Sequence, residues 1–416
     1  MNALWLQIKP ANLADVVFAF LVLLVFVLPF SIPLAGGVFV LTLFLALAES
    51  FLQRHQERAA LVPRQLQHLL WALVAVTVFS VSQSLNPGAS AYNLVYVVGQ
   101  HVGCFWLVLR YGAQGKRPLL LIKAFLIAGA LVACYGVYQY VTDVPMLEQE
   151  WVDPAQFPEL KKRAFSTLQN PNILGSFLVL VAAYCAGIFA PLRGGKTRIA
   201  LLVIFAVSCL CLLLTYSRGS WISLFCALFV FAAKFYHKAF IPFIAGGLTV
   251  LYIGWDLLAR RILSIFTATD TSVALRFSYV ESSAWMIWEH PLGVGWYGYR
   301  YAFPDYDFYL QNAQVIMYHC HNLYLNVAAE LGVVGLFILL AALWQFFKIA
   351  WHLARTAQTV WIKGIACGYV AALTGILVNG LTDHTLFNIQ LGMLFWLLNG
   401  LLLTCAYLER QNIENS

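Results

Sequence analysis

Long apolar runs recur along almost the whole chain, and they constrain its fold more than any other feature. Each is roughly 17–25 residues long, which is enough for a helix to cross the ~30 Å hydrocarbon core of a bilayer. Inside lipid only helices and closed barrels satisfy every backbone polar group, and continuous rather than alternating runs favour helices. With 62% hydrophobic and 10% charged residues, the chain has too little polar surface for a soluble protein. The sequence predicts an all-α integral membrane protein.

Hydropathy, with Pro, Gly and charge as boundaries, predicts about twelve transmembrane helices. We expect them near 14–31, 34–51, 66–84, 92–110, 119–140, 172–191, 199–216, 220–236, 240–258, 321–348, 362–381 and 386–407. The first run lacks a small-residue cleavage site and is followed at once by a second, so it is expected to stay as a span rather than act as a signal peptide. The chain divides into 1–258 with nine spans and an outer loop at about 141–171, a periplasmic segment at 259–320, and 321–416 with three spans and a short cytoplasmic tail.

The distribution of Lys and Arg predicts the orientation, because short cytoplasmic loops carry an excess of both. With the N-terminus inside, the inner segments hold Lys9, Arg54, Arg58, Arg64, Arg110, Lys116, Arg117, Arg193, Lys196, Arg198, Lys234, Lys238, Lys348, Arg355, Lys363 and Arg410. Three outer connections, near 31–34, 84–91 and 382–386, hold none. We therefore expect both termini in the cytoplasm.

The basic residues that remain outside are Lys161, Lys162, Arg163, Arg218, Arg260, Arg261, Arg276 and Arg300. Charge placed against the topological bias predicts a functional surface on that side of the membrane. Long loops also cross membranes regardless of charge, and interfacial anchoring explains Arg260 and Arg261 equally well.

The first outer loop places the basic triplet 161–163 before the turn Asn170-Pro171-Asn172, with Asn172 as the expected N-cap of the sixth span. The free N–H groups of a helix N-terminus beside an arginine suit a phosphate. A capped loop with solvated lysines is the alternative.

Two further arginines fit an anionic ligand. Arg218 lies in a short turn between hydrophobic helices, where a guanidinium either binds phosphate in bidentate fashion or extends to lipid headgroups. Arg276 begins a stretch at 276–288 with the pattern of an amphipathic helix, ended by Pro291, Gly293 and Gly295. The tyrosines that follow suit either sugar stacking or an interfacial belt.

His321 is expected at or near the first turn of the tenth helix, where the helix dipole disfavours the protonated imidazole. A neutral histidine beside arginines suits a general base, although a structural histidine is the alternative. A metal on His319 and His321 would need further ligands, and alternate positions diverge on a helix, so we expect no metal. Asp383 and His384, in the last outer turn, either form a second acid–base pair that orients another group or cap the loop.

The nine cysteines predict neither zinc nor a disulfide framework. Eight fall within expected spans, Cys320 lies near an outer boundary, and the sequence contains no CxxC pair. No nucleotide-binding glycine loop is present, and we expect no cofactor and no nucleic acid as a partner. Outward arginines with one histidine suit a lipid-linked diphosphate, because the arginines stabilise the leaving group while the histidine deprotonates an acceptor hydroxyl.

Four local patterns resemble the O-antigen ligase family of Gram-negative bacteria, within the wider ligase/polymerase superfamily. They are Arg163-Ala-Phe-Ser-Thr-Leu-Gln-Asn-Pro-Asn172, Ser217-Arg218-Gly219, Arg276 followed by His290-Pro-Leu-Gly-Val-Gly295, and His321-Asn-Leu-Tyr-Leu325 followed by Glu330-Leu-Gly332. The resemblance implies metal-independent, inverting transfer of O-antigen from undecaprenyl diphosphate to lipid A–core oligosaccharide, at the periplasmic face of the inner membrane.

The resemblance also implies roles for residues. His321 would be the base, and Arg218 and Arg276 would bind the diphosphate. Substrate contacts are expected from Lys161, Lys162, Arg163, His319, Asn322, Tyr324, Asp383 and His384. An O-antigen polymerase or a protein O-oligosaccharyltransferase shares this scaffold. A transporter would instead show repeats and charged residues at mid-membrane.

Overall fold

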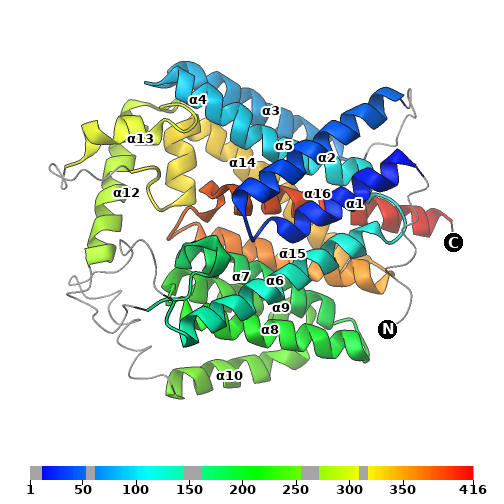
Figure 1. The fold of residues 1–416 in the computed structure, drawn as a ribbon. Helices are drawn as coiled ribbons and strands as arrows, with labels where there is room; N and C mark the ends of the chain where they lie inside the picture. Colours follow the sequence, from blue (N-terminus) through cyan, green and yellow to red (C-terminus); the bar gives the residue numbers. More distant parts are fainter. Residues whose placement is uncertain (1–11, 53–60, 145–161, 254–270, 309–316, 416) are drawn as a thin grey trace.

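A computed structural model describes residues 12–52, 61–144, 162–253, 271–308 and 317–415 (Figure 1). Within these ranges the chain is helical and contains no strand. The helices are α1 (Leu13–Val27), α2 (Ile32–Leu52), α3 (Arg64–Ser80), α4 (Pro87–Asn93), α5 (Gly99–Gly112), α6 (Arg117–Val141), α7 (Pro171–Phe189), α8 (Lys196–Leu214), α9 (Arg218–Phe235), α10 (Phe240–Ile253), α12 (Thr271–Glu289), α13 (Tyr299–Ala302), α14 (Leu323–Thr356), α15 (Val360–Asn379) and α16 (Ile389–Glu414). Lys161, Arg260 and Arg261 lie outside the described residues.

Ten helical segments in the described ranges are long and apolar enough to cross a membrane. They are Ile32–Leu52, Arg64–Gln83, Pro87–Gly112, Arg117–Val141, Pro171–Phe189, Lys196–Leu214, Arg218–Phe235, Leu323–Thr356, Val360–Asn379 and Ile389–Glu414. The prediction of a helical integral membrane protein is confirmed. The expected first and ninth spans coincide with the shorter apolar helices α1 and α10, so the number twelve stays a prediction.

Helix α15 packs against α7, α9 and α14 near the centre of the bundle. Small residues allow α7 and α15 to approach closely. A Cβ on Gly187 of α7 would collide with the backbone of Gly368 on α15. Close approach of small residues is a normal device of membrane helices, because dispersion contacts replace the hydrophobic drive that lipid removes.

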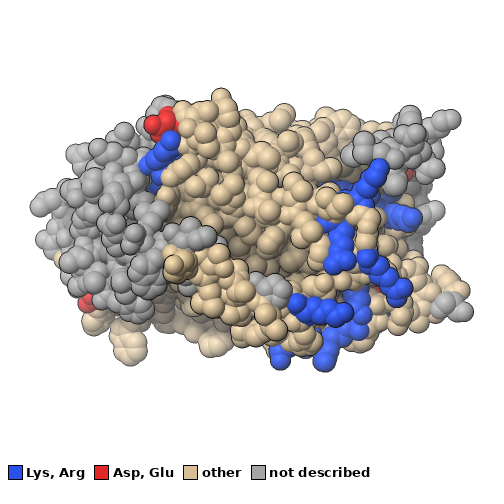
Figure 2. Space-filling model, turned by 90° about the horizontal axis from the view of Figure 1, so that it is seen from below, with Lys and Arg blue, Asp and Glu red and all other residues tan. Residues whose placement is uncertain are grey.

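Lys and Arg side chains gather at one end of the molecule (Figure 2). This is the end at which α16 finishes, and α12 and α13 lie at the opposite end (Figure 1). The basic end includes Arg110 at the finish of α5, Arg117 at the start of α6 and Lys196 at the start of α8. The separation of charge expected from the sequence is therefore present in the described part of the fold.

Helix α14 is interrupted at Gly332, where φ is 74° and ψ is 170°. The segment 290–298, which follows α12, binds at this interruption. Val294 N–H donates to the carbonyl of Ala329 at 2.8 Å, and Val333 N–H donates to the carbonyl of Pro291 at 3.2 Å. A Cβ on Gly332 would lie 2.6 Å from the Pro291 oxygen, so only glycine fits. The contact fixes the end of α12 against α14.

Helix α12 occupies the place predicted for an amphipathic helix. Tyr279, Ser283 and Met286 are buried against the protein, whereas Val280 and Trp288 are exposed. The helix therefore has one face on the bundle and one apolar face that is free to meet lipid.

Candidate functional site

Several connections meet at the end of the bundle opposite the basic one. Leu323 N–H, at the start of α14, donates to the carbonyl of Gly380, just after α15, at 2.8 Å. Ala164 N–H donates to the carbonyl of Leu214 at 2.9 Å, which joins the segment before α7 to the α8–α9 turn. Asn379 Nδ2 donates to Ser220 Oγ at 3.3 Å, which joins α15 to α9. Four segments that are distant in sequence are thereby brought together.

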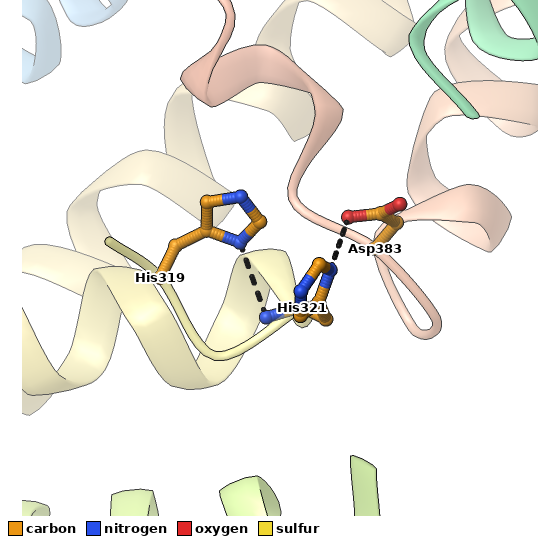
Figure 3. Close-up of side chains that lie close together, drawn as sticks. All are labelled: His319, His321 and Asp383. Carbon is orange, nitrogen blue, oxygen red and sulfur yellow. Dashed lines mark hydrogen bonds and ion pairs between the residues drawn. The ribbon is translucent and has the colours of Figure 1, made fainter. Parts of the chain in front are cut away.

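His321 and Asp383 form a hydrogen-bonded pair at this meeting point (Figure 3). His321 Nδ1 lies 3.0 Å from Asp383 Oδ1. Because an ionised carboxylate can only accept, Nδ1 carries the proton and the lone pair resides on Nε2. Asp383 Oδ1 also accepts the backbone N–H of His384 at 2.8 Å. The pair has the arrangement of a histidine base held and oriented by a carboxylate.

Asp383 is ionised because of its neighbours. Burial alone would raise the pKa of its carboxyl group, but the positive charge that His321 carries when protonated and the hydrogen bond from its Nδ1 outweigh burial. With smaller contributions from His319 and Arg276, they lower the Asp383 pKa below its usual range. The carboxylate is therefore available to stabilise an imidazolium at His321.

His321 lies next to the first turn of α14, as expected, but outside the helix itself. The N-cap of α14 is Asn322, whose side chain accepts from the N–H groups of Tyr324 and Leu325, both at 3.0 Å. His321 precedes the helix and has a φ of 53°, in the left-handed region. The Tyr324 hydroxyl donates to the carbonyl of Leu377 at 2.6 Å. Asn322 and Tyr324 thus fix the start of α14 to α15.

The expectation that His319 and His321 diverge is wrong, because residues 319–321 are not helical. Their ring centroids are 4.5 Å apart, and one ligand atom from each, together with one from Asp383, lies within 4.8 Å of the others. This set of donors could hold a metal ion, although both Nδ1 atoms already take part in hydrogen bonds.

Two of the expected arginines border the pair. Arg276 lies one turn before Tyr279 on α12, and the Tyr279 ring stacks on His321 with centroids 6.0 Å apart. The charge of Arg276 also acts on Asp383. Arg218 is the first residue of α9, and a Cβ on the next residue, Gly219, would collide with the Thr382 hydroxyl, directly before Asp383. Both guanidinium groups are partly exposed.

Arg163 is placed differently, being only 9% exposed. Its Nε donates to the carbonyl of Thr215 at 2.7 Å, and its Nη2 donates to Asn172 Oδ1 at 3.1 Å. The expectation that Asn172 caps α7 is wrong. Asn170 is the cap, because its side chain accepts from Asn172 N–H at 2.8 Å and from Ile173 N–H at 3.3 Å. Arg163 thereby holds the turn that precedes Arg218.

The other residues expected to contact the substrate lie either near the His321–Asp383 pair or apart from it. Lys162 pairs with Asp143 at 3.1 Å and lies 5.1 Å from the centre of the Tyr140 ring. His384 is buried, which lowers its pKa to about 4, and its Nδ1 has no hydrogen-bond partner in the described structure. Phe387 packs its ring 5.0 Å from that of His319.

Of the aromatic residues near the site, Tyr279 and Phe387 were not predicted, whereas Tyr297 belongs to the tyrosine-rich stretch expected to suit sugar stacking or an interfacial belt. Tyr279 follows Arg276 at helical spacing, which is the only local signal that could have placed it beside the site. Tyr297, with a φ of 60°, stacks on Phe387 with ring planes 8° apart and centroids at 5.6 Å. Nothing local in the sequence links Tyr297 to Phe387, because their contact depends on how α13 and α16 are placed.

These features define a helical membrane protein with a histidine oriented by a carboxylate and two arginines at one end of the bundle. Residues 200–340 match the family model described as O-antigen ligase, which confirms the resemblance to this family in the ligase/polymerase superfamily. The matched segment contains Arg218, Arg276 and His321 and ends before Asp383. The family suggests an enzyme of glycosyl transfer. No curated protein matches the chain.

Proposed function

We propose that the protein is an O-antigen ligase, which transfers O-antigen from undecaprenyl diphosphate to a hydroxyl of lipid A–core oligosaccharide. The observation that carries the proposal is the His321–Asp383 pair, in which His321 Nε2 makes no hydrogen bond to another described residue. His321 and nearby Arg276 both lie in the segment that matches the family. A histidine oriented in this way has the arrangement of a general base.

In the proposed reaction the acceptor hydroxyl oxygen attacks the anomeric carbon of the donor. The bond between that carbon and the diphosphate oxygen breaks, and undecaprenyl diphosphate leaves with the electron pair. The hydroxyl proton passes to His321 Nε2, and the Asp383 carboxylate stabilises the resulting imidazolium. Attack opposite to the leaving group inverts the anomeric configuration.

Arg276 and Arg218 would bind the diphosphate. A guanidinium donates two parallel hydrogen bonds to phosphate oxygens and stabilises the negative charge that grows as the bond to sugar breaks. In this mechanism the two arginines supply the charge that a divalent cation supplies in other glycosyltransferases. Arg163 contributes indirectly, because it holds the α8–α9 turn.

The distribution of charge supports a periplasmic site in the inner membrane. The Lys and Arg cluster lies at the end opposite α12, and such clusters favour the cytoplasmic side (Figure 2). With that orientation the site faces the periplasm, where lipid-linked donors are the available source of activated sugar.

Complementation of a ligase-deficient strain tests the proposal. His321→Ala and Arg276→Ala are expected to abolish O-antigen ladders on lipopolysaccharide while leaving the amount of membrane protein unchanged. The matched controls are His68→Ala and Arg355→Ala, which alter exposed residues on α3 and α14, away from the site. Full ladders from His321→Ala would refute the proposed base.

The same gels separate the ligase from a polymerase. A ligase defect leaves polymer on the undecaprenyl carrier, whereas a polymerase defect leaves one repeat unit attached to the core. If loss of activity leaves glycan attached to the core but limits it to one repeat unit, the site belongs to a polymerase.

A further inference from the structure

The backbone of His321 adopts a conformation that residues other than glycine rarely take. Its φ of 53° lies in the left-handed region, where Cβ crowds the following carbonyl. Such a conformation persists only where neighbouring contacts enforce it. For His321 this matters directly, because the backbone angle sets where the ring lies relative to Asp383.

One contact acts on the strained residue itself. The His321 backbone N–H donates to His319 Nδ1 at 3.2 Å (Figure 3). A side-chain acceptor bound to the N–H two residues later is the arrangement of an Asx turn, in which Asn or Asp imitates a backbone turn. Here an imidazole takes the place of the amide or carboxylate.

The contact determines the tautomer of His319. Nδ1 can accept only if it carries no proton, so the proton of the neutral ring is on Nε2. Burial, followed by the positive charge that His321 carries when protonated, lowers the pKa of His319 to about 3. The ring therefore remains neutral, and remains an acceptor, throughout the physiological range of pH.

The same geometry argues against His319 as the base. Its Nδ1 lone pair is occupied by the His321 N–H, and its Nε2 carries the proton. Its ring is packed against Phe387 at 5.0 Å and lies 5.9 Å from the His384 ring. His321, by contrast, has the Asp383 carboxylate as a partner, and its Nε2 makes no hydrogen bond to another described residue.

We propose that His319 is a positioning residue, whose Nδ1 holds the His321 backbone in the left-handed conformation that aligns the His321 ring with Asp383. The inference rests on the proposed function, in which His321 is the base. This role of His319 differs from metal binding and from direct proton transfer, because neither would require His319 to hold the His321 backbone.

Two substitutions separate the acceptor from the ring. His319→Asn keeps a side-chain acceptor at the distance that suits an Asx turn but removes the ring. His319→Phe keeps a ring that can pack on Phe387 but removes the acceptor. We expect kcat for glycan transfer to fall about 10-fold or more in His319→Phe and to stay within about 3-fold in His319→Asn, since a lost hydrogen bond corresponds to roughly this ratio.

The assay uses the full-length protein in detergent or nanodiscs, with lipid-linked donor and lipopolysaccharide acceptor, and it measures kcat and KM separately. Equal loss of kcat in both variants would overturn the inference and indicate that His319 acts as a base, a metal ligand or a substrate contact. Full activity of His319→Phe with loss in His319→Asn would overturn it in favour of ring packing. Thermal unfolding of each variant excludes loss of fold as the cause.

His321→Ala distinguishes failure of this inference from failure of the proposed function. If His321→Ala is active, the proposed function is refuted. If His321→Ala is inactive while both His319 variants are fully active, only the positioning role is refuted.

Discussion

Substitution of Asp383 by Asn removes one negative charge and changes almost nothing else. In the native protein Asp383 Oδ1 accepts both from His321 Nδ1 at 3.0 Å and from His384 N–H at 2.8 Å. The amide oxygen of Asn can accept both hydrogen bonds in the same place. The His321 ring should therefore keep its orientation and its tautomer, and the variant tests the charge alone.

The size of the effect follows from the geometry. In the transition state His321 gains a proton, and the attraction between imidazolium and carboxylate is lost in the variant. For charge centres about 4 Å apart and an effective dielectric constant of about 20, this attraction is about 4 kcal/mol. The two side chains are 24% and 11% exposed, so water reduces it, and about 2–4 kcal/mol remains. The expected fall in kcat is roughly 30- to 1,000-fold.

The assay is transfer of a purified lipid-linked glycan to lipopolysaccharide under single-turnover conditions, with donor KM measured in parallel. KM should change little, because the charge acts on the proton-transfer step. Asp143→Asn is the matched control, since Asp143 is an exposed carboxylate paired with Lys162. A kcat within about 3-fold of wild type in Asp383→Asn would refute the role of Asp383 in stabilising the imidazolium.

Two further predictions concern stability. Gly332→Ala should lower the free energy of unfolding by about 2 kcal/mol or more and reduce glycan transfer, because the new Cβ would lie 2.6 Å from the Pro291 oxygen and disrupt the contact that fixes α12. Thermal unfolding measures the first effect. The control Gly36→Ala should show neither effect, because no atom lies within 4 Å of its added Cβ. Burial lowers the pKa of His384 to about 4, below the ~6.5 of an unfolded histidine, so its neutral form stabilises the fold above pH ~6.5 and this contribution is lost as pH falls towards 4. His384→Phe should therefore flatten the decline of the melting temperature between pH 7 and 5, and an unchanged slope would contradict this account.

Much of the scaffold could be predicted because its signals are local. A membrane-spanning helix is recognised from about twenty consecutive apolar residues, and the side of each loop from its own Lys and Arg content. The same reasoning singled out His321, Arg218 and Arg276, since charged or titratable residues at a membrane boundary are costly without a function or a partner. Local reasoning failed where one residue decides a cap, as with Asn170 in place of Asn172.

The sequence by itself determined that this protein is a helical membrane protein, that its basic residues segregate, and that short motifs of the O-antigen ligase family lie along it in order. Only the tertiary structure decided that Asp383, 62 residues after His321, is its partner, and that His319 turns back to bind the His321 backbone. The physical reason is that hydropathy and charge act residue by residue along the chain. The 3.0 Å hydrogen bond between His321 and Asp383 depends instead on how α14 and α15 pack, and on the left-handed backbone of His321, which no local sequence pattern predicts.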